Sequence, residues 1–456
     1  MKRFALLLLA FWATGFDYFR LNRPVPSSDV VIRMPQLERQ ILPSGVQLIV
    51  HSDAYLPLFH IRVQFLSGLA VEPANQRGAL RLLFRTLVSE NRALLSALDE
   101  LGATPSLAVD EDAVSVAVQV RAEDATSAIS AVLRALVEPK WDEAELKNAQ
   151  QSLYRELATK TQSPHAAARL ALNRILFPKD HPLCRNPKDE AAEVKKRNLE
   201  ELKVLHRSFV VSRNLAIAIA GRIAPPVAAV WVKKSLTGLP EGDVPQPVLP
   251  IPKPEKRTAS YVVPYPGLVQ SVIFIGRRAP SDGHVDAPAL EMAAGWVSTN
   301  VGQQLREEKT VTYGASAHYQ KSAQSGVFVV TAAVEAQHTG YAAREVLSQI
   351  FAATSDMVNS KLLPMYRAHM VRDITEESAS LAGIGALSEG IFRYGPDHWQ
   401  KRIAKIQTVS HPEVYKALRD YVVPDTLEVV IAGDPAVIEP QLKKEGLGPV
   451  RILGTP

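Results

Sequence analysis

Apolar and polar positions alternate along some stretches of the chain and follow a helical period along others. Alternation predicts strands at "GVQLIVH" (45–51), "FHIRVQF" (59–65) and "NLAIAIAG" (214–221). The stretch "AVSVAVQV" (113–120) could form a strand or a buried helical turn, and its valines and regular alternation favour the strand.

Long helical segments lie between these strands. "DEAELKNAQQSLYRELATK" (142–160) has apolar residues near helical spacing, and Asp142 is suited to its N-cap, so it is predicted to be a helix. The helices are too numerous for a sandwich of two sheets. We therefore expect an α+β fold with a mainly antiparallel sheet covered by helices, chiefly on one face.

A proline-rich passage, "LPEGDVPQPVLPIPKPEKR" (239–257), interrupts both kinds of pattern. Proline removes backbone donors and favours extended chain, so this passage is predicted to be a linker between domains. Its two flanks have similar lengths, which makes an internal repeat worth testing.

The two flanks do match one another. "HRSFVVSRNLAIAIAG" and "LRDYVVPDTLEVVIAG" align at an offset of 212 residues, as do "LYREL" and "MYRAH", and a third match appears at an offset of 208. The aligned pairs are 206–221 with 418–433, 153–157 with 365–369, and 60–68 with 271–276. The sequence therefore predicts two tandem copies of one domain, residues 33–238 and 258–456.

The first 25 residues have a character of their own. Two cations precede an apolar stretch from Phe4 to Phe16, which is the form of a secretory signal. That stretch is short of the roughly 20 residues that span a bilayer, so an uncleaved anchor is the weaker of two alternatives. Either alternative predicts an exported protein, and the anchor would associate it with a membrane.

Charge and cysteine content exclude several functions. The 52 basic residues stand against 47 acidic ones without a basic block, so nucleic-acid binding is not expected. Cys184 is the only cysteine, which rules out an intrachain disulfide and a thiolate metal cluster. We interpret it as a partly buried small residue.

No common hydrolase motif is present. None of the eleven histidines stands four residues from another, and neither H-E-x-x-H nor H-x-x-E-H occurs. The nucleophile elbow G-x-S-x-G and a glycine-rich phosphate loop are also missing. A lone histidine in a strand, such as His60, is expected to be a structural residue with its hydrogen bonds satisfied.

One stretch, "VGQQLREEKTVTYGASAHY" (301–319), carries a specific arrangement. Residues 295–309 are predicted to form a helix and residues 313–319 a strand, which places Arg306 near a helix end and Tyr313 at a strand start. A guanidinium and a phenol that meet could hold a peptide carbonyl or stabilise an oxyanion. The alternative is a surface arginine beside a core tyrosine, which spacing alone favours.

The repeat, the linker and "LREEKTVTYGASA" together resemble the pitrilysin or insulinase family of zinc peptidases, over about residues 36–440. The resemblance implies two α/β-roll domains. Active members carry G-x-x-H-x-x-E-H on a helix of the first domain. Here the corresponding "GALRLLFR" has Arg81 and Arg85 at the histidine positions and Phe84 at the glutamate. Cations cannot ligate Zn²⁺, and phenylalanine cannot take a proton from water.

The resemblance also implies roles for other residues. A distal glutamate ligand would lie on the helix with Glu143 and Glu145, where we expect ordinary solvated carboxylates. Arg306 and Tyr313 match the family's second-domain pair, which engages the substrate backbone at a zinc site across a chamber.

This pattern resembles the non-catalytic subunit of a two-chain peptidase. It implies a periplasmic chain without a metal or cofactor of its own, inactive when alone, with a homologous zinc-bearing partner in a heterodimer and with peptides as substrates. The alternatives are a non-enzymatic scaffold of the same fold and an autonomous metallopeptidase with a relocated metal site.

Overall fold

The computed structural model describes residues 34–160, 163–247, 249–250, 259–308, 312–355 and 362–454, with the side chains of 306–308, 313 and 355 excluded. The N-terminal segment 1–25, and with it the prediction of a signal or anchor, lies outside the described residues. Across the part of the chain that is described, no helix is long and apolar enough to cross a membrane.

The first half contains one six-stranded sheet and the helices around it. Its strands are β1 (Glu38–Ile41), β2 (Gln47–Ser52), β3 (Leu58–Phe65), β4 (Ser106–Val109), β5 (Val114–Arg121) and β6 (Leu215–Gly221). Its main helices are α2 (Ala79–Phe84), the π-helix η3 (Arg85–Ser89), α3 (Arg92–Asp99), α4 (Ala125–Val137), α5 (Glu143–Lys160), α6 (Pro164–Leu176), α7 (Pro187–Val194), α8 (Leu199–Phe209) and α9 (Pro225–Ser235).

The second half repeats this plan. Its strands are β7 (Ser260–Pro264), β8 (Gln270–Ala279), β9 (Thr312–Lys321), β10 (Gly326–Glu335), β11 (Glu428–Gly433) and β12 (Val450–Ile452). Its main helices are α10 (Ala287–Gly302), the π-helix η7 (Gln303–Glu308), α11 (Thr339–Ser355), α12 (Leu363–Glu377), α13 (Leu381–Tyr394), α14 (His398–Thr408), α15 (His411–Tyr421) and α16 (Pro435–Lys444). The predicted α+β class with two mainly antiparallel sheets is confirmed.

The two sheets have matching strand orders, β1-β2-β6-β3-β5-β4 and β12-β7-β11-β8-β10-β9. In the first sheet only β2 and β6 are parallel neighbours, while β7 is parallel to both β11 and β12 in the second. β4 and β9 are therefore the corresponding edge strands of the two halves.

Strand register corrects one of the sequence alignments. Ile61 on β3 pairs with Ile219, and Ile273 on β8 pairs with Ile431. Strands β3 and β8 therefore align at the same offset of 212 as β6 and β11, and the offset of 208 was wrong. Short apolar strands match one another at several registers, so similarity of type alone could not choose between them.

Local sequence signals also repeat. A capping box of Asn198 with Glu201 begins α8, and one of Ser410 with Glu413 begins α15 at the equivalent position. Each satisfies two backbone donors that a helix start would leave free. Asp142 accepts from the backbone N–H of Ala144 and Glu145 at the start of α5, as its sequence position predicted.

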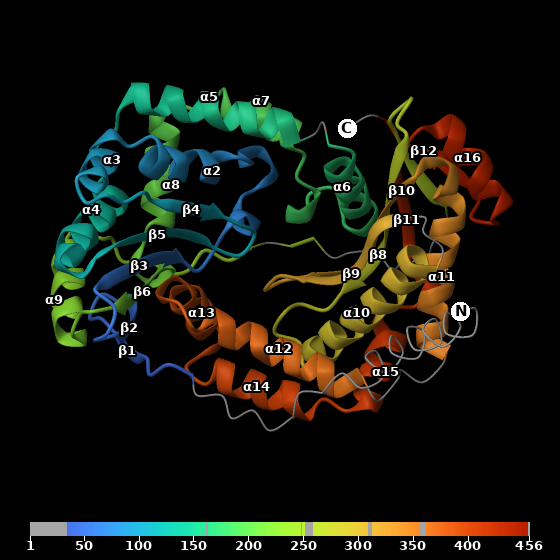
Figure 1. Cartoon of the computed structure of the whole chain (residues 1–456). Coiled ribbons are helices and arrows are strands. Elements are labelled where there is room, and N and C mark those ends of the chain that lie inside the picture. The colour runs from blue at the N-terminus through green and yellow to red at the C-terminus, as the bar shows by residue number, and fades with distance from the viewer. Residues whose placement is uncertain are drawn as a thin grey trace, which may run out of the picture.

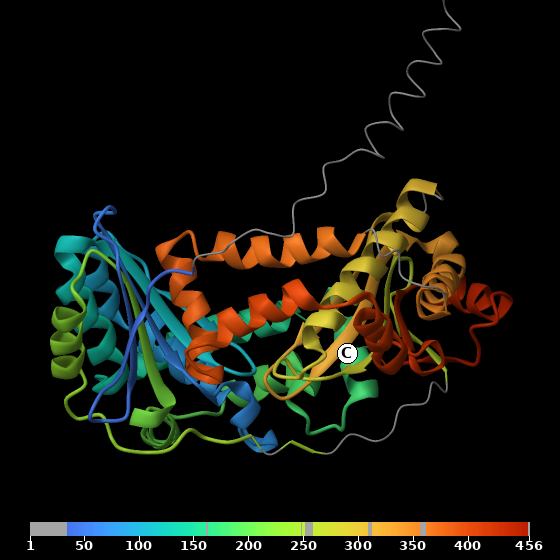
Figure 2. The same ribbon diagram turned by 90° about the horizontal axis from the view of Figure 1, so that it is seen from below.

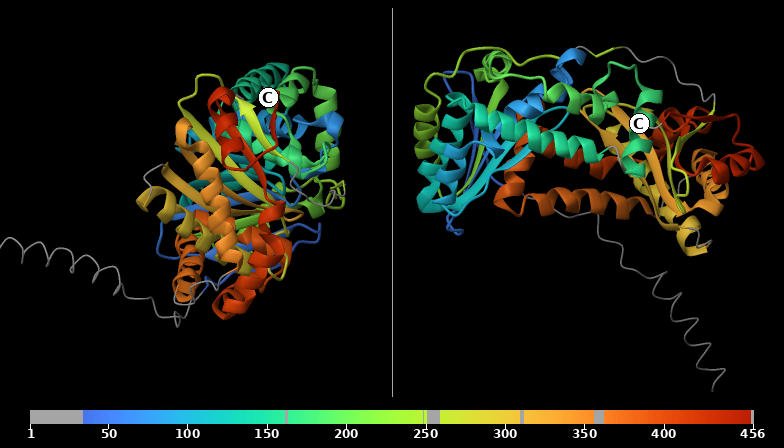
Figure 3. Two further views of the ribbon diagram at one scale, coloured as in Figure 1. Left: turned by 90° about the vertical axis from the view of Figure 1, so that its right-hand side faces the viewer. Right: turned by 90° about the horizontal axis from the view of Figure 1, so that it is seen from above.

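Each sheet has one face packed against helices of its own half and the other against a helix of the opposite half (Figure 1). Helix α6 of the first half packs on β7, β8 and β11, whereas α13 of the second half packs on β2, β3 and β6. The halves lie at opposite ends of an elongated molecule, with helices extending across the middle (Figures 2 and 3). The sequence predicted that helices cover one face of each sheet. The helix exchanged from the opposite half covers the other face.

Candidate functional site

The degenerate motif lies on α2 and on the π-helix that continues it. Gly78 precedes α2 with a φ of 85°, in the left-handed region, which favours glycine. The Glu72 carboxylate accepts from the backbone N–H of Leu80 at 2.5 Å and so fixes the start of the helix. A π-helix is rare and often marks a functional site. The second half repeats it, because η7 follows α10 as η3 follows α2.

Arg81, at the first histidine position, is held by the first half itself. One terminal nitrogen donates to the carbonyl oxygen of Val109 on the edge strand β4 at 3.2 Å, and Nε lies 3.7 Å from a carboxylate oxygen of Glu190. Glu190 is buried, whereas Arg81 keeps a quarter of its side chain exposed. This guanidinium ties α2 to β4 and to α7.

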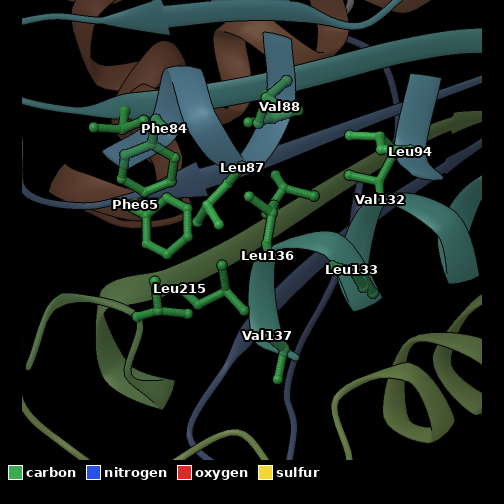
Figure 4. Packing of buried hydrophobic residues seen from close by; sticks show 14 of the residues in the cluster. Phe65, Phe84, Leu87, Val88, Leu94, Val132, Leu133, Leu136, Val137 and Leu215 are labelled. Atoms are coloured by element: carbon green, nitrogen blue, oxygen red, sulfur yellow. The ribbon is translucent and has the colours of Figure 1, made fainter. Parts of the chain in front are cut away.

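Phe84, at the position of the catalytic glutamate, belongs to the hydrophobic core. It is fully buried, with ring centroids 4.9 Å from Phe65 and 5.7 Å from Phe209. Figure 4 shows its ring against Phe65 in the same core that holds Leu87 and Leu215. A carboxylate could not replace this ring without burying a charge among aromatic side chains.

Arg85, at the second histidine position, forms an ion pair and a hydrogen bond with Glu156 on α5. Lys160, one turn further along α5, binds the other oxygen of the same carboxylate at 2.6 Å. Burial by itself would raise the pKa of Glu156, but Lys160 and Arg85 outweigh it and lower the pKa. The Glu156 carboxylate thus faces the second histidine position. Two cations, Arg85 and Lys160, bind it where the zinc motif that the sequence resembles would place a metal ion.

The carboxylate that faces the motif lies on the expected helix, but its position on that helix and the burial of Glu145 differ from expectation. Glu156, not Glu143 or Glu145, faces the motif. Glu145 is not a solvated carboxylate either, because it is buried and accepts from the backbone N–H of Arg92 at the start of α3, at 2.9 Å. Glu143 is exposed, as expected. Helical position decided which carboxylate faces the motif, and the sequence did not show how α5 is rotated about its axis.

A buried group of charges lies beside Arg81. Arg185 donates to Glu72 at 2.6 Å and to Glu190 at 3.1 Å, and its Nε lies 3.9 Å from Glu111. Burial opposes a charge on Arg185, but these three carboxylates outweigh it and raise its pKa. Burial raises the pKa of Glu111 to about 7 in spite of Arg185 and Arg81. No signal in the sequence predicted this cluster, since Glu72 and Glu111 lie far from Arg185 along the chain.

The charges line a cavity of about 550 Å³ between the two halves. From the first half it is bounded by Arg81, Glu111, Arg185 and Glu190, and from the second by Lys321 and Glu389. Acidic and basic groups both line it, so it suits a ligand with donors and acceptors, such as a peptide backbone, better than a simple ion.

Arg306 and Tyr313 lie in the second half. Arg306 belongs to η7 and Tyr313 to β9, as the predicted helix and strand require, but both side chains lie outside the described part of the structure. On β10, Ala333 pairs with Gly314 and Val334 with Thr312, so Tyr313 is the extra residue of a β-bulge in an edge strand. Bulges of this kind often re-aim a side chain beside an active site. The prediction that the two side chains meet remains a prediction.

The side chains present do not fit zinc at the motif, where two guanidinium groups and a phenyl ring replace the ligands and the base. Within the described ranges, no group of three or more histidine, cysteine, aspartate or glutamate side chains could hold a metal ion.

Cys184 is more buried than expected and donates to the Asn173 carbonyl oxygen. His60 differs from expectation too, since neither ring nitrogen has a hydrogen-bond partner among the described residues.

Comparison with known proteins is consistent with this geometry. A family model described as "Peptidase M16 inactive domain" matches residues 196–367, and no curated protein matches the chain. A peptidase M16 inactive domain from Pseudomonas fluorescens has a TM-score of 0.78 at 17% identity, covering 88% of this chain and 98% of its own. A protease from Helicobacter pylori has a TM-score of 0.78 at 14% identity, covering 88% and 100%. A chain of Complex III from Candida albicans has a TM-score of 0.73 at 14% identity, covering 90% and 100%.

The fold and the arginine-bearing helix together define a peptidase-like protein without the ligand set of a zinc enzyme. The fold is shared with a peptidase M16 inactive domain of known structure, and residues 196–367 match the family model of that description, in agreement with the pitrilysin or insulinase type that the sequence resembles.

Proposed function

We propose that this chain is the catalytically silent subunit of a heterodimeric zinc peptidase. A homologous partner with an intact zinc motif supplies the metal and the base. This chain completes the substrate chamber and contributes Arg306 and Tyr313 to binding of the peptide backbone or of the transition state. The proposal includes export to the periplasm, directed by the N-terminal segment 1–25.

The observation that carries the proposal is the Arg85–Glu156 ion pair. It fills the position of a metal with a side-chain cation and keeps the helices η3 and α5 together. Without Arg85, Glu156 would be left partly buried with only Lys160 as its partner, and an incompletely paired buried charge costs stability. The motif helix is thus maintained as a wall of the chamber.

The bulge at Tyr313 supports a role for the second half. An extra residue interrupts the pairing of β9 with β10, and η7, which carries Arg306, packs against β9. A phenol and a guanidinium directed to one point can donate hydrogen bonds to a carbonyl oxygen that gains negative charge during hydrolysis.

The test is a cleavage assay of the complex. The full chain is mixed with a purified partner that carries the intact motif, and kcat/KM is measured on a peptide library. Removing one oxyanion donor costs about 100-fold to 1,000-fold in rate, so Arg306→Ala and Tyr313→Phe are each expected to lower kcat/KM by about that much. Arg372→Ala, a change at an exposed arginine of the same half, is the control and should leave the rate unchanged.

Two results would contradict the proposal. Unchanged cleavage in both variants would mean that the site is not shared, and the chain would then be a non-enzymatic scaffold. The Candida albicans chain of similar fold comes from Complex III, so assembly is the function to examine in that case. Stoichiometric zinc in the isolated chain, with cleavage by it alone, would instead identify an autonomous peptidase.

A further inference from the structure

The two exchanged helices dock on equivalent sheet faces of opposite chemistry. We call α13 with β2, β3 and β6 the α13 interface, and α6 with β7, β8 and β11 the α6 interface. The offset of 212 places His60, Arg62 and Gln64 of β3 where β8 has Val272, Phe274 and Gly276. These triplets lie on the face that receives the exchanged helix.

The α6 interface is apolar. Phe274, Val327, Val329, Val430 and Ala432 form one buried cluster with alanines and leucines of α6, including Ala168 and Leu172. Gly276 gives α6 a close approach, since a Cβ there would lie 3.2 Å from the Leu172 side chain. Burial of this kind contributes about 25 cal/mol for each Å² of apolar surface removed from water. The polar side chain of His165 on α6 packs with its ring centroid 4.8 Å from that of Phe274, and partial burial lowers its pKa.

The α13 interface is divided by polar side chains. His60 is 5% exposed and Gln64 is fully buried, and none of their side-chain nitrogen and oxygen atoms has a hydrogen-bond partner in the described part of the chain. Gly385 of α13 approaches so closely that a Cβ there would lie 3.0 Å from Nε2 of His60. Only two small apolar clusters, around Ile391 and around Ile384, flank this row.

Unpartnered polar groups weaken the docking of α13. Each such group gives up its hydrogen bonds to water when α13 docks and recovers them when α13 leaves. Among the residues that the structure describes, the α6 interface carries no comparable row of buried polar atoms without partners, so the two helices should differ in how easily they separate from their sheets.

The charged groups around His60 determine how docking of α13 responds to acid. Arg62 lies beside it on β3, and Glu389 of α13 lies 3.9 Å from Arg62 and also binds Arg393. The neighbouring strands present uncharged side chains, Gln119 on β5 and Ala220 on β6. Burial and then Arg62 lower the pKa of His60 to about 4, so the docked helix keeps the ring neutral. Acid favours the undocked state, in which the ring can take a proton.

We infer that α13 is a releasable strap and α6 a fixed attachment, so that the halves open about α6 when α13 leaves the first sheet. Opening on this side exposes the cavity, because Glu389 of α13 lines it. Arg393 of α13 also holds the carbonyl oxygen of Asp112, which precedes β5. The inference stands on the two interfaces alone and does not depend on a partner or on peptidase function.

Hydrogen–deuterium exchange of the full chain tests it, with α6 as the internal reference. At pH 7 the amides of α13 are expected to exchange at least about tenfold faster than those of α6 after correction for sequence, because local opening is set by the free energy of docking. Lowering the pH to 5 should widen the difference. Equal protection of the two helices at both pH values would overturn the inference.

The pseudo-symmetry supplies matched variants. His60→Val installs the residue type of the equivalent position and should slow exchange in α13 by about tenfold while removing most of its response to acid. Val272→His makes the reverse change and should speed exchange in α6 alone. If the amide exchange rate of α13 is unchanged in His60→Val, the inference is wrong. If this variant failed to fold, the comparison of α13 with α6 in the unmodified chain would still decide.

A distance measurement distinguishes separation of the two halves from local unfolding of α13. Spin labels at Tyr55→Cys and Val269→Cys, both largely exposed and on opposite halves, are placed in a Cys184→Ala background. The distance distribution should broaden from pH 7 to pH 5 and stay narrow when His60→Val is added. A distribution that is narrow at both pH values would show that the halves do not open.

Discussion

Arg85 on η3, at the second histidine position of the zinc motif that the sequence resembles, forms an ion pair with Glu156 on α5. Lys160 binds the same carboxylate. The Arg85 guanidinium links η3 to α5, as Arg81 links α2 to β4 and α7. In this chain the two arginines are structural residues.

This ion pair should contribute modestly to stability. Arg85 and Glu156 are 23% and 37% exposed, so solvent screens them, and a coupling free energy of roughly 0.5–1 kcal/mol is expected. A double-mutant cycle of Arg85→Ala and Glu156→Ala, followed by urea unfolding, measures it. The exposed pair of Lys196 with Glu193 serves as the control and should show a smaller coupling. A coupling near zero for Arg85 and Glu156 would mean that the pair does not bridge the helices.

Arg185 should be far more important than Arg85. Its removal in Arg185→Met leaves Glu72 buried without its cation and Glu190 with only the more distant Arg81, and such a loss costs about 3–5 kcal/mol in unfolding free energy. Because burial raises the pKa of Glu72 and of Glu111, these carboxyl groups lose their charge as the pH falls and no longer need the cation, so the deficit should shrink from pH 8 to pH 5. Chemical denaturation across that range checks both statements, and a deficit independent of pH would contradict the assigned cause.

Restoring the zinc motif should not restore cleavage. In Arg81→His/Phe84→Glu/Arg85→His, the new carboxylate would enter the aromatic cluster of Phe65 and Phe209, with a cost of about 3 kcal/mol or more. The double variant Arg81→His/Arg85→His keeps Phe84 and should fold better, with Glu156 available as a third ligand. Zinc titration and peptide cleavage are the measurements. Strong zinc-dependent cleavage by the triple variant would prove this prediction wrong.

Acid should destabilise the protein through His60. Its pKa is lowered to about 4 in the folded chain, below the ordinary 6.5, so its contribution is complete above pH 6.5 and is lost as the pH falls toward 4. Between pH 7 and pH 5 this group alone should cost about 2 kcal/mol of unfolding free energy. His60→Val should show a correspondingly smaller loss in chemical denaturation, and an identical loss in both proteins would remove His60 as the cause.

The sequence predicted the fold well because its signals are local. Alternation located β2, β3, β5 and β6, and Asp142 marked the start of α5. The sequence also showed that one half repeats the other. It could not show that α6 and α13 exchange sheets, because that depends on how the halves meet rather than on any one segment.

The site was predictable only as far as residue type allowed. Arg81, Phe84 and Arg85 were identifiable as positions without metal chemistry, but their contacts were not. Glu156 and Arg185 were missed because Arg85 and Glu72, the partners that define their roles, lie 71 and 113 positions away along the chain. A carboxylate about three to four helical turns from the expected place carries no distinguishing mark in a sequence.

The exchange of α6 and α13 makes the proline-rich linker a poor place to divide the molecule. A chain cut there would give two pieces, each holding a helix that covers the other's sheet, and neither piece would have a complete core by itself. The duplicated halves are easy to tell apart in the sequence, yet a half expressed alone would expose the sheet face that the exchanged helix covers.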